Sequence, residues 1–152
     1  EDLANGHFHN VLDDSDDLDK AAVTRLILCS GKVYYDLLAA RRERGLENVA
    51  LVRLEQLYPF PEAELLQVLG NYPNVTDAAW CQEEPQNQGA WYSSQHHMRR
   101  VMYAHNPDVY LRYAGREPSA APAAGYMALH LAQQEAFIND ALAPTWLEEN
   151  QN

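Results

Sequence analysis

The sequence predicts an α/β fold in which a mostly parallel open sheet is flanked by helices. Short apolar runs alternate four times with longer segments in which apolar residues recur at helical spacing. The chain has 152 residues, 47% of them hydrophobic, which suits one compact domain with its own core. Since crossover connections between parallel strands are right-handed, we expect at least the first strands to run parallel.

The first predicted strand and helix lie within residues 23–44. Residues 23–29 form an apolar run rich in branched side chains that stops at Ser30-Gly31, which is typical of a buried strand. A helix is expected over residues 32–44, because arginines in its last turn and Gly45 after it are typical of a helix end.

The second strand and helix are predicted at residues 49–54 and 61–70. The apolar run over residues 49–54 predicts another buried strand. Pro61 at the start, acidic residues in the first turn and Gly70 at the end define the helix. The side chains expected to be buried in this helix are Leu65, Leu66, Val68 and Leu69.

Two more strand–helix pairs complete the predicted sheet. Residues 75–81 form a third strand before a helix over residues 90–104, and residues 109–113 form a fourth strand before a last helix that ends near Leu142. The buried face of the third helix is expected to contain Trp91, Ser94, Met98, Val101 and Met102. The aligned apolar residues of the last helix are Met127, Leu131, Ile138 and Leu142.

The two ends of the chain depart from this pattern. Residues 1–20 contain a run of aspartates with few apolar anchors, and we interpret them as an acidic lead-in or linker whose charges are solvated. Residues 143–152 are expected to be a loose tail, which leaves residues 21–142 as the α/β domain. The chain starts with Glu1 rather than Met, which indicates processing or a piece of a larger protein.

Composition argues against several classes of function. A formal net charge of -11 argues against nonspecific binding to nucleic acid or to anionic membranes. The sequence has no apolar run near the roughly 20 residues that a membrane-spanning helix needs. Cys29 and Cys81 lie in apolar runs without a C-x-x-C motif, so we expect buried, reduced thiols. Neighbouring histidines on a helix, such as His96 and His97, diverge by about 100° and cannot bind one metal ion together.

Polar side chains follow the carboxyl ends of the predicted strands, where open parallel sheets bind their ligands. This candidate rim consists of Ser30, Lys32, Gln56, Glu83, Glu84, Asn87, Gln88, Arg116 and Ser119. Three interpretations stay open: an anion site at Lys32 and Arg116, a protein interface centred on residues 86–92, or ordinary helix capping and loop chemistry. The residues around Gly31 match neither the dinucleotide-binding pattern nor the P-loop pattern.

Several segments are similar to one known family. They are residues 25–36 (RLILCSGKVYYD), 52–61 (VRLEQLYPFP), 80–92 (WCQEEPQNQGAWY), 111–116 (LRYAGR) and 125–127 (GYM). On these motifs, the chain from Phe8 to Leu142 resembles the C-terminal domain of the decarboxylating component of the 2-oxoglutarate dehydrogenase complex. The resemblance is closest to the bacterial branch of that family.

The resemblance implies a citric acid cycle enzyme that decarboxylates 2-oxoglutarate with thiamine diphosphate and Mg²⁺. Such enzymes are homodimers that pass the succinyl group to the lipoyl arm of the next component, in the bacterial cytoplasm or the mitochondrial matrix. Their C-terminal domain resembles that of transketolase, and its expected work is dimer packing and support of the active-site domains. We therefore expect no catalytic, cofactor-binding or metal-binding residue in this chain, and no activity from it alone.

Two further hypotheses come from other classes of function. One is a regulatory nucleotide or anion site at the rim. Some actinobacterial relatives bind acetyl-CoA through a glutamine that matches Gln56 and through basic residues after the Pro-x-Pro turn. Here Glu62, Ala63 and Glu64 occupy those basic positions and would repel an anionic coenzyme. The other hypothesis is an independent thiol enzyme that uses Cys29 as its nucleophile.

Overall fold

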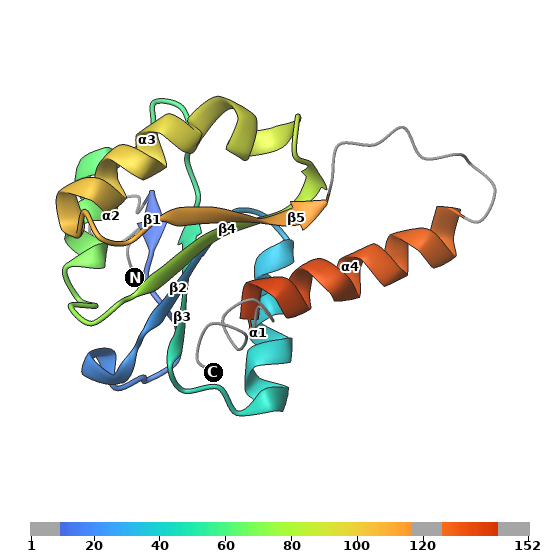
Figure 1. The fold of residues 1–152 in the computed structure, drawn as a ribbon, viewed down its shortest axis with the longest axis horizontal. Coiled ribbons are helices and arrows are strands. Elements are labelled where there is room, and N and C mark those ends of the chain that lie inside the picture. Colours follow the sequence, from blue (N-terminus) through green and yellow to red (C-terminus); the bar gives the residue numbers. More distant parts are fainter. Residues whose placement is uncertain (1–9, 117–125, 143–152) are drawn as a thin grey trace, which may run out of the picture.

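The computed structural model describes residues 10–116 and 126–142 and has the predicted α/β architecture (Figure 1). A five-stranded sheet of order β1-β3-β2-β4-β5 lies between two layers of helices. The strands are β1 (Val11–Leu12), β2 (Arg25–Cys29), β3 (Val49–Leu54), β4 (Asp77–Pro85) and β5 (Leu111–Arg116). The helices are α1 (Val33–Arg44), α2 (Glu62–Leu69), α3 (Gly89–His105) and α4 (Tyr126–Leu142), with a short 3-10 turn at Lys20–Ala22.

Strands β2 to β5 are parallel, as the sequence predicts. In the centre of the sheet, Leu28 of β2 pairs with Val52 of β3 on one side and with Trp80 of β4 on the other. The short β1 pairs antiparallel with β3, with Val11 opposite Leu54. Because parallel strands point the same way, the carboxyl ends of β2 to β5 share one edge of the sheet, which we call the carboxyl edge.

The sheet is covered by apolar side chains on both faces. Leu26 and Leu28 belong to the cluster that includes α2 and α3, whereas Ile27 and Cys29 belong to the cluster that includes α1 and α4. Figure 1 shows these two pairs of helices on opposite sides of the sheet. Since neighbouring side chains of a strand point to opposite faces, a sheet covered on both sides requires the continuous apolar runs seen in this sequence.

The predicted C-terminal end of α1 and the predicted buried face of α3 are confirmed, and α1 begins one residue later than predicted. Helix α1 covers Val33–Arg44, and Gly45 after it adopts a left-handed φ of 63°, which glycine tolerates best. The side chains of α3 that are buried are the five predicted ones, Trp91, Ser94, Met98, Val101 and Met102.

Strands β4 and β5 differ from their predicted bounds. Strand β4 continues beyond Cys81 to Pro85, and β5 covers Leu111–Arg116 instead of residues 109–113. The extension pairs with β5 at Gln82, opposite Gly115, and resumes at Pro85 after an irregular step. Backbone hydrogen bonds between strands do not require apolar side chains. The prediction therefore ended β4 too early, at the point where the sequence becomes polar.

Burial in α2 and α4 also differs from the prediction. In α2 only Leu65 and Leu69 are buried, while Leu66 is 40% exposed and Val68 is half-buried. Neighbouring residues of a helix diverge by about 100°, so a short helix on a sheet buries one narrow face. In α4, Leu131 is 62% exposed, whereas Ile138 and Leu142 are buried as predicted. The side chain of Met127 lies outside the described residues.

The acidic lead-in contributes to the sheet and to a buried ion pair. The carboxylate of Asp14 accepts hydrogen bonds from the guanidinium of Arg41 and, at 2.7 Å, from the backbone N–H of Leu51. The side chains of Asp14 and Arg41 are 3% and 2% exposed. The expectation of solvated charges is therefore wrong for Asp14, because the pairing of β1 with β3 brings this segment against α1. The division at residues 20 and 142 stays a prediction, and the expected tail lies outside the described residues.

Candidate functional site

A group of polar side chains meets at the carboxyl edge of the sheet. We call it the rim cluster, and it consists of Lys32, Asp36, Glu83, Arg116, Gln133 and Gln134. Lys32, Glu83 and Arg116 follow or end parallel strands, which is why the sequence predicts them. Asp36 comes from α1 and the two glutamines from α4. Those three were missed, because no sequence signal places α4 across the end of the sheet.

Gln134 lies at the centre of the rim cluster. Its Nε2 donates to Glu83 Oε1 at 3.1 Å and to Asp36 Oδ2 at 3.0 Å, while its Oε1 accepts from Arg116 Nη2 at 2.7 Å. Lys32 Nζ lies 3.7 Å from Glu83 Oε2. Asp36, Glu83 and Arg116 are thus linked to one another through one amide, and Lys32 joins them through Glu83, which favours a fixed arrangement.

Arg116 anchors α4 to the end of β5. The residue is 8% exposed, and its Nη1 donates to Gln133 Oε1 at 2.9 Å. Its guanidinium also lies 5.3 Å from the ring centre of Phe137, a distance typical of a cation–π contact. Lys32, whose side chain is 84% exposed, is by contrast a cation that the rim cluster presents to solvent.

The remaining predicted rim residues lie apart from these contacts. Ser30 is half-buried after β2, and Gln56 stays in its own loop, where its Nε2 donates to Pro59 O at 3.4 Å. Exposed positions at the end of β4 and in the following turn are Glu84, Asn87 and Gln88. Ser119 lies outside the described residues. The structure therefore joins three of the predicted residues, Lys32, Glu83 and Arg116, in one cluster.

Gln82 organises the turn between β4 and α3, although no sequence motif distinguishes it from the polar residues around it. It is 1% exposed, and its Oε1 accepts from Trp80 Nε1 at 2.8 Å and from the Trp91 backbone N–H at 3.0 Å. Its Nε2 lies within 3.0 Å of the carbonyl oxygens of Glu84, Pro85 and Gln88. A buried amide saturated in this way fixes both the end of β4, where Glu83 lies, and the start of α3.

The two thiols are buried on the face of the sheet that α1 and α4 cover. Cys29 and Cys81 are each 0% exposed and free, as predicted. Burial raises the pKa of Cys29 to about 12, and burial together with the neighbouring Cys29 raises the pKa of Cys81 well above its usual value. Because the thiolate is the nucleophile, these values argue against a thiol enzyme that uses Cys29.

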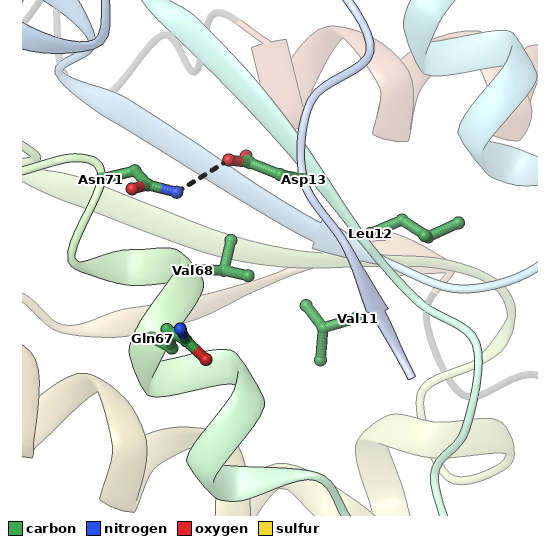
Figure 2. Close-up of a pocket in the computed structure, with 6 residues that line it drawn as sticks. All are labelled: Val11, Leu12, Asp13, Gln67, Val68 and Asn71. Carbon is green, nitrogen blue, oxygen red and sulfur yellow. Dashed lines mark hydrogen bonds between the residues drawn. The ribbon is translucent and has the colours of Figure 1, made fainter. Parts of the chain in front are cut away.

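The described residues line several surface hollows, and one of them touches the rim cluster. One pocket of about 390 Å³ opens between β1 and α2 and is lined by Val11, Leu12, Asp13, Gln67, Val68 and Asn71 (Figure 2). In this pocket, Asn71 Nδ2 donates to Asp13 Oδ2 at 2.9 Å across the gap between the two segments. Another hollow of about 450 Å³ lies between α1 and α4 and touches the rim cluster at Asp36 and Gln134.

A second charged network lies at the opposite edge of the sheet. Asp77 accepts from Arg25 Nε at 2.8 Å and from Arg112 Nε at 3.3 Å. The same two arginines donate to the carbonyl oxygens of residues 140–142 at the end of α4. Basic groups favour a helix C-terminus, so this network fixes the far end of α4. Its role is structural, since every group that we name here binds another part of the same fold.

A family profile and several known proteins match most of this chain. A family profile described as 2-oxoglutarate dehydrogenase C-terminal matches residues 1–142. A 2-oxoglutarate dehydrogenase E1 component from Azotobacter vinelandii is 61% identical over 141 residues, which cover 93% of this chain. E1 components from Haemophilus influenzae and Cupriavidus necator are each 50% identical, over 94% and 93% of this chain. The match covers only 15% of the length of each of these three relatives.

Within residues 10–116 and 126–142, no helix has the length and apolar character that a membrane crossing requires.

Proposed function

Because the chain belongs to the family of 2-oxoglutarate dehydrogenase C-terminal domains, we propose that it is the scaffold and dimer-interface domain of an E1 component. The whole enzyme decarboxylates 2-oxoglutarate with thiamine diphosphate in the citric acid cycle. It then transfers the succinyl group to the lipoyl arm of the succinyltransferase component. We place this enzyme in the bacterial cytoplasm as a homodimer, since the relatives are bacterial.

One observation carries the proposal of a scaffold role. Asp36, Glu83 and Arg116 of the rim cluster bind one another through Gln134, and the buried Arg116 uses its donors to hold α4. Groups that are fixed in this way present a rigid, polar surface to a neighbour instead of a reactive group to a substrate. A rigid polar surface with exposed Lys32 at its border suits the polar rim that surrounds the core of a protein interface.

The described residues do not fit the binding of thiamine diphosphate with Mg²⁺. Among residues 10–116 and 126–142, no group of three His, Cys, Asp or Glu side chains is placed to hold a metal ion. The Asp and Glu groups of the rim cluster are instead spread around Gln134 and Lys32. We therefore assign the cofactor to the preceding domains and derive no step of the reaction from this chain.

A regulatory anion site at the rim is supported less well. Lys32 lies beside the carboxylate of Glu83, and Glu83 shares Gln134 with Asp36, so an incoming anion would meet two negative charges. Near the start of α2, Glu64 accepts from Asn10 Nδ2 at 2.7 Å and Glu62 pairs with Arg100. These carboxylates strengthen the argument against an anionic coenzyme at that position.

Calorimetric titration tests whether this chain binds thiamine diphosphate or an adenine nucleotide. The folded 152-residue chain is titrated with thiamine diphosphate and Mg²⁺, and separately with adenine nucleotides, with a cooperative urea-unfolding curve as the control for folding. We expect no saturable binding in either titration. Tight binding of thiamine diphosphate would contradict the scaffold role. Saturable nucleotide binding that is lost in Lys32→Ala would support the anion site instead.

A further inference from the structure

We propose that one face of α3 docks an acidic surface of the remaining E1 polypeptide. We call this face the tyrosine stripe, and it consists of Tyr92, His96, Arg99 and Tyr103 of α3 together with Tyr110 before β5. The proposal rests on the proposed function, because it concerns the surface through which the domain contacts the rest of the enzyme. It adds a location and a chemical class of partner that the rim cluster does not supply.

The spacing of the stripe places its residues on one side of α3. They follow one another at steps of four, three and four residues, which is the repeat of a single helical face. Tyr92, Tyr103 and Tyr110 are 70%, 71% and 70% exposed. The stripe runs from the carboxyl edge at Tyr92 to the opposite edge at Tyr110, because Leu111 pairs with Ala78 near the start of β4.

Arg99 is held in a fixed position at the centre of the stripe. Its guanidinium lies 5.0 Å from the ring centre of Trp91 and 5.2 Å from that of Tyr110, and its Nη2 donates to Tyr110 Oη at 2.9 Å. Its Nη1 donates to Gln95 Oε1 at 2.9 Å. An arginine that is already ordered loses little side-chain entropy when it binds a partner, which favours a role in recognition.

The charge of this face points to an acidic partner. In the described part of the chain, the hydrogen bonds of Arg99 go to an amide and a phenol, and its buried Nε has no hydrogen-bond partner there. Helix α3 contains two arginines and three histidines and no Asp or Glu, in a chain with 22 acidic residues. Arg100 pairs with Glu62, whereas the hydrogen-bond partners of Arg99 among the described residues are uncharged, so its positive charge can attract an incoming carboxylate. At the border of the stripe, Tyr110 shares hollows with Asp77, Asp108 and Asp140. The carboxylates of Asp77 and Asp140 pair there with Arg112.

The composition and shape of the stripe also suit a protein partner. Tyrosine and arginine are enriched at the energetic centres of interfaces, whereas Lys, Glu and Asp are depleted there. A hollow of about 200 Å³ between Tyr103 and Tyr110 would accept one inserted side chain. The chain spans about 15% of the length of its relatives, so an E1 polypeptide contains a long remainder that can supply the surface which covers this face.

Hydroxyl-radical labelling of the full-length enzyme tests the location. The exposed fractions within the domain predict fast labelling of Tyr103 and Tyr110, whereas Tyr72, 1% exposed, is the internal standard for a buried ring. We expect both stripe tyrosines to be labelled about as slowly as Tyr72, because the partner covers them. Fast labelling of Tyr103 and Tyr110 with slow labelling of Tyr35 and Tyr58 at the carboxyl edge would overturn the stripe and leave the proposed function standing. Fast labelling of all four would overturn both.

A pair of opposite charge changes tests the chemistry of the partner. In the full-length enzyme, Tyr103→Glu places a carboxylate against the proposed acidic surface, and Tyr103→Lys places a cation there. We expect the glutamate variant to raise the labelling rate of Tyr110 by about fivefold and the lysine variant to leave it unchanged. Since residue 103 is exposed, neither variant removes a core contact. Equal rates at Tyr110 in the two variants would overturn the acidic partner.

Discussion

The carboxylate of Asp14 is buried against the guanidinium of Arg41 and receives the backbone N–H of Leu51. Removal of one member of a buried ion pair leaves an uncompensated charge, which typically costs about 3–5 kcal/mol. We therefore expect Asp14→Ala to lower the free energy of unfolding of the chain by about 3 kcal/mol, measured by urea denaturation. The matched change Asp17→Ala alters an exposed aspartate and should stay within about 0.5 kcal/mol. Equal losses in both variants would contradict the buried pair.

Asp16 links the same segment to α1 and makes stability depend on pH. Hydrogen bonds from Arg42, and then from Arg41, lower the pKa of Asp16 from 3.8 to about 2. The folded pKa lies below the unfolded one, so the stabilisation is complete above the unfolded pKa and is lost as pH falls toward about 2. Its side chain is 27% exposed, and screening limits the contribution to about 1 kcal/mol.

The free energy of unfolding of the wild type falls between about pH 5 and pH 2.5. We predict that this fall is smaller by about 1 kcal/mol in Asp16→Asn. The measurement is the free energy of unfolding from urea titrations at the two pH values, for the wild type and the variant. An unchanged difference between the two pH values would show that the ion pair does not stabilise the fold.

Single residues could be predicted where the signal is local. The buried face of α3 follows from helical periodicity within one segment, and all five of its residues were predicted. Asp14 was missed because its partners are 27 and 37 residues away along the chain. Nothing in a run of similar aspartates distinguishes the buried one from its solvated neighbours.

At the scale of elements, the junction between β4 and α3 depends on one buried amide. Gln82 accepts from the Trp80 side chain and the Trp91 backbone, and its Nε2 faces three carbonyl oxygens. Removal of such a group leaves several buried donors and acceptors without partners. Each of them that water cannot reach costs about 1–3 kcal/mol. We expect Gln82→Ala to lower the free energy of unfolding by about 3 kcal/mol in urea denaturation.

Gln88→Ala is the control for this junction. Gln88 is exposed and contributes its backbone oxygen, which the substitution keeps. Its effect should stay within about 0.5 kcal/mol. If Gln82→Ala were as mild as this control, the amide would not organise the junction.

Elements were predicted well in their order and less well at their ends. Apolar runs locate β2 and β3 because both faces of those strands are covered. The polar end of β4 and the two-residue β1 have no such signal, since each exists through pairing with a strand distant in sequence.

At the scale of the whole molecule, α4 connects the two edges of the sheet. Arg116 holds its middle at the carboxyl edge, and Arg25 and Arg112 hold its C-terminus at the other edge. The alternation of strands and helices predicts the fold, and the comparisons confirm the family that the motifs indicate. The sequence predicts part of the rim cluster, because strand ends converge, and misses the part that α4 supplies.

The dimerisation of the full-length enzyme is the most direct test of the proposed interface role. Lys32 and Lys20 each lie beside a carboxylate, Glu83 and Asp13, but only Lys32 belongs to the rim cluster. The account predicts that Lys32→Glu raises the dimer dissociation constant by about tenfold, or about 1.4 kcal/mol, in sedimentation equilibrium, while Lys20→Glu leaves it unchanged. Identical dissociation constants for the wild type and both variants would contradict a dimer interface at the rim cluster.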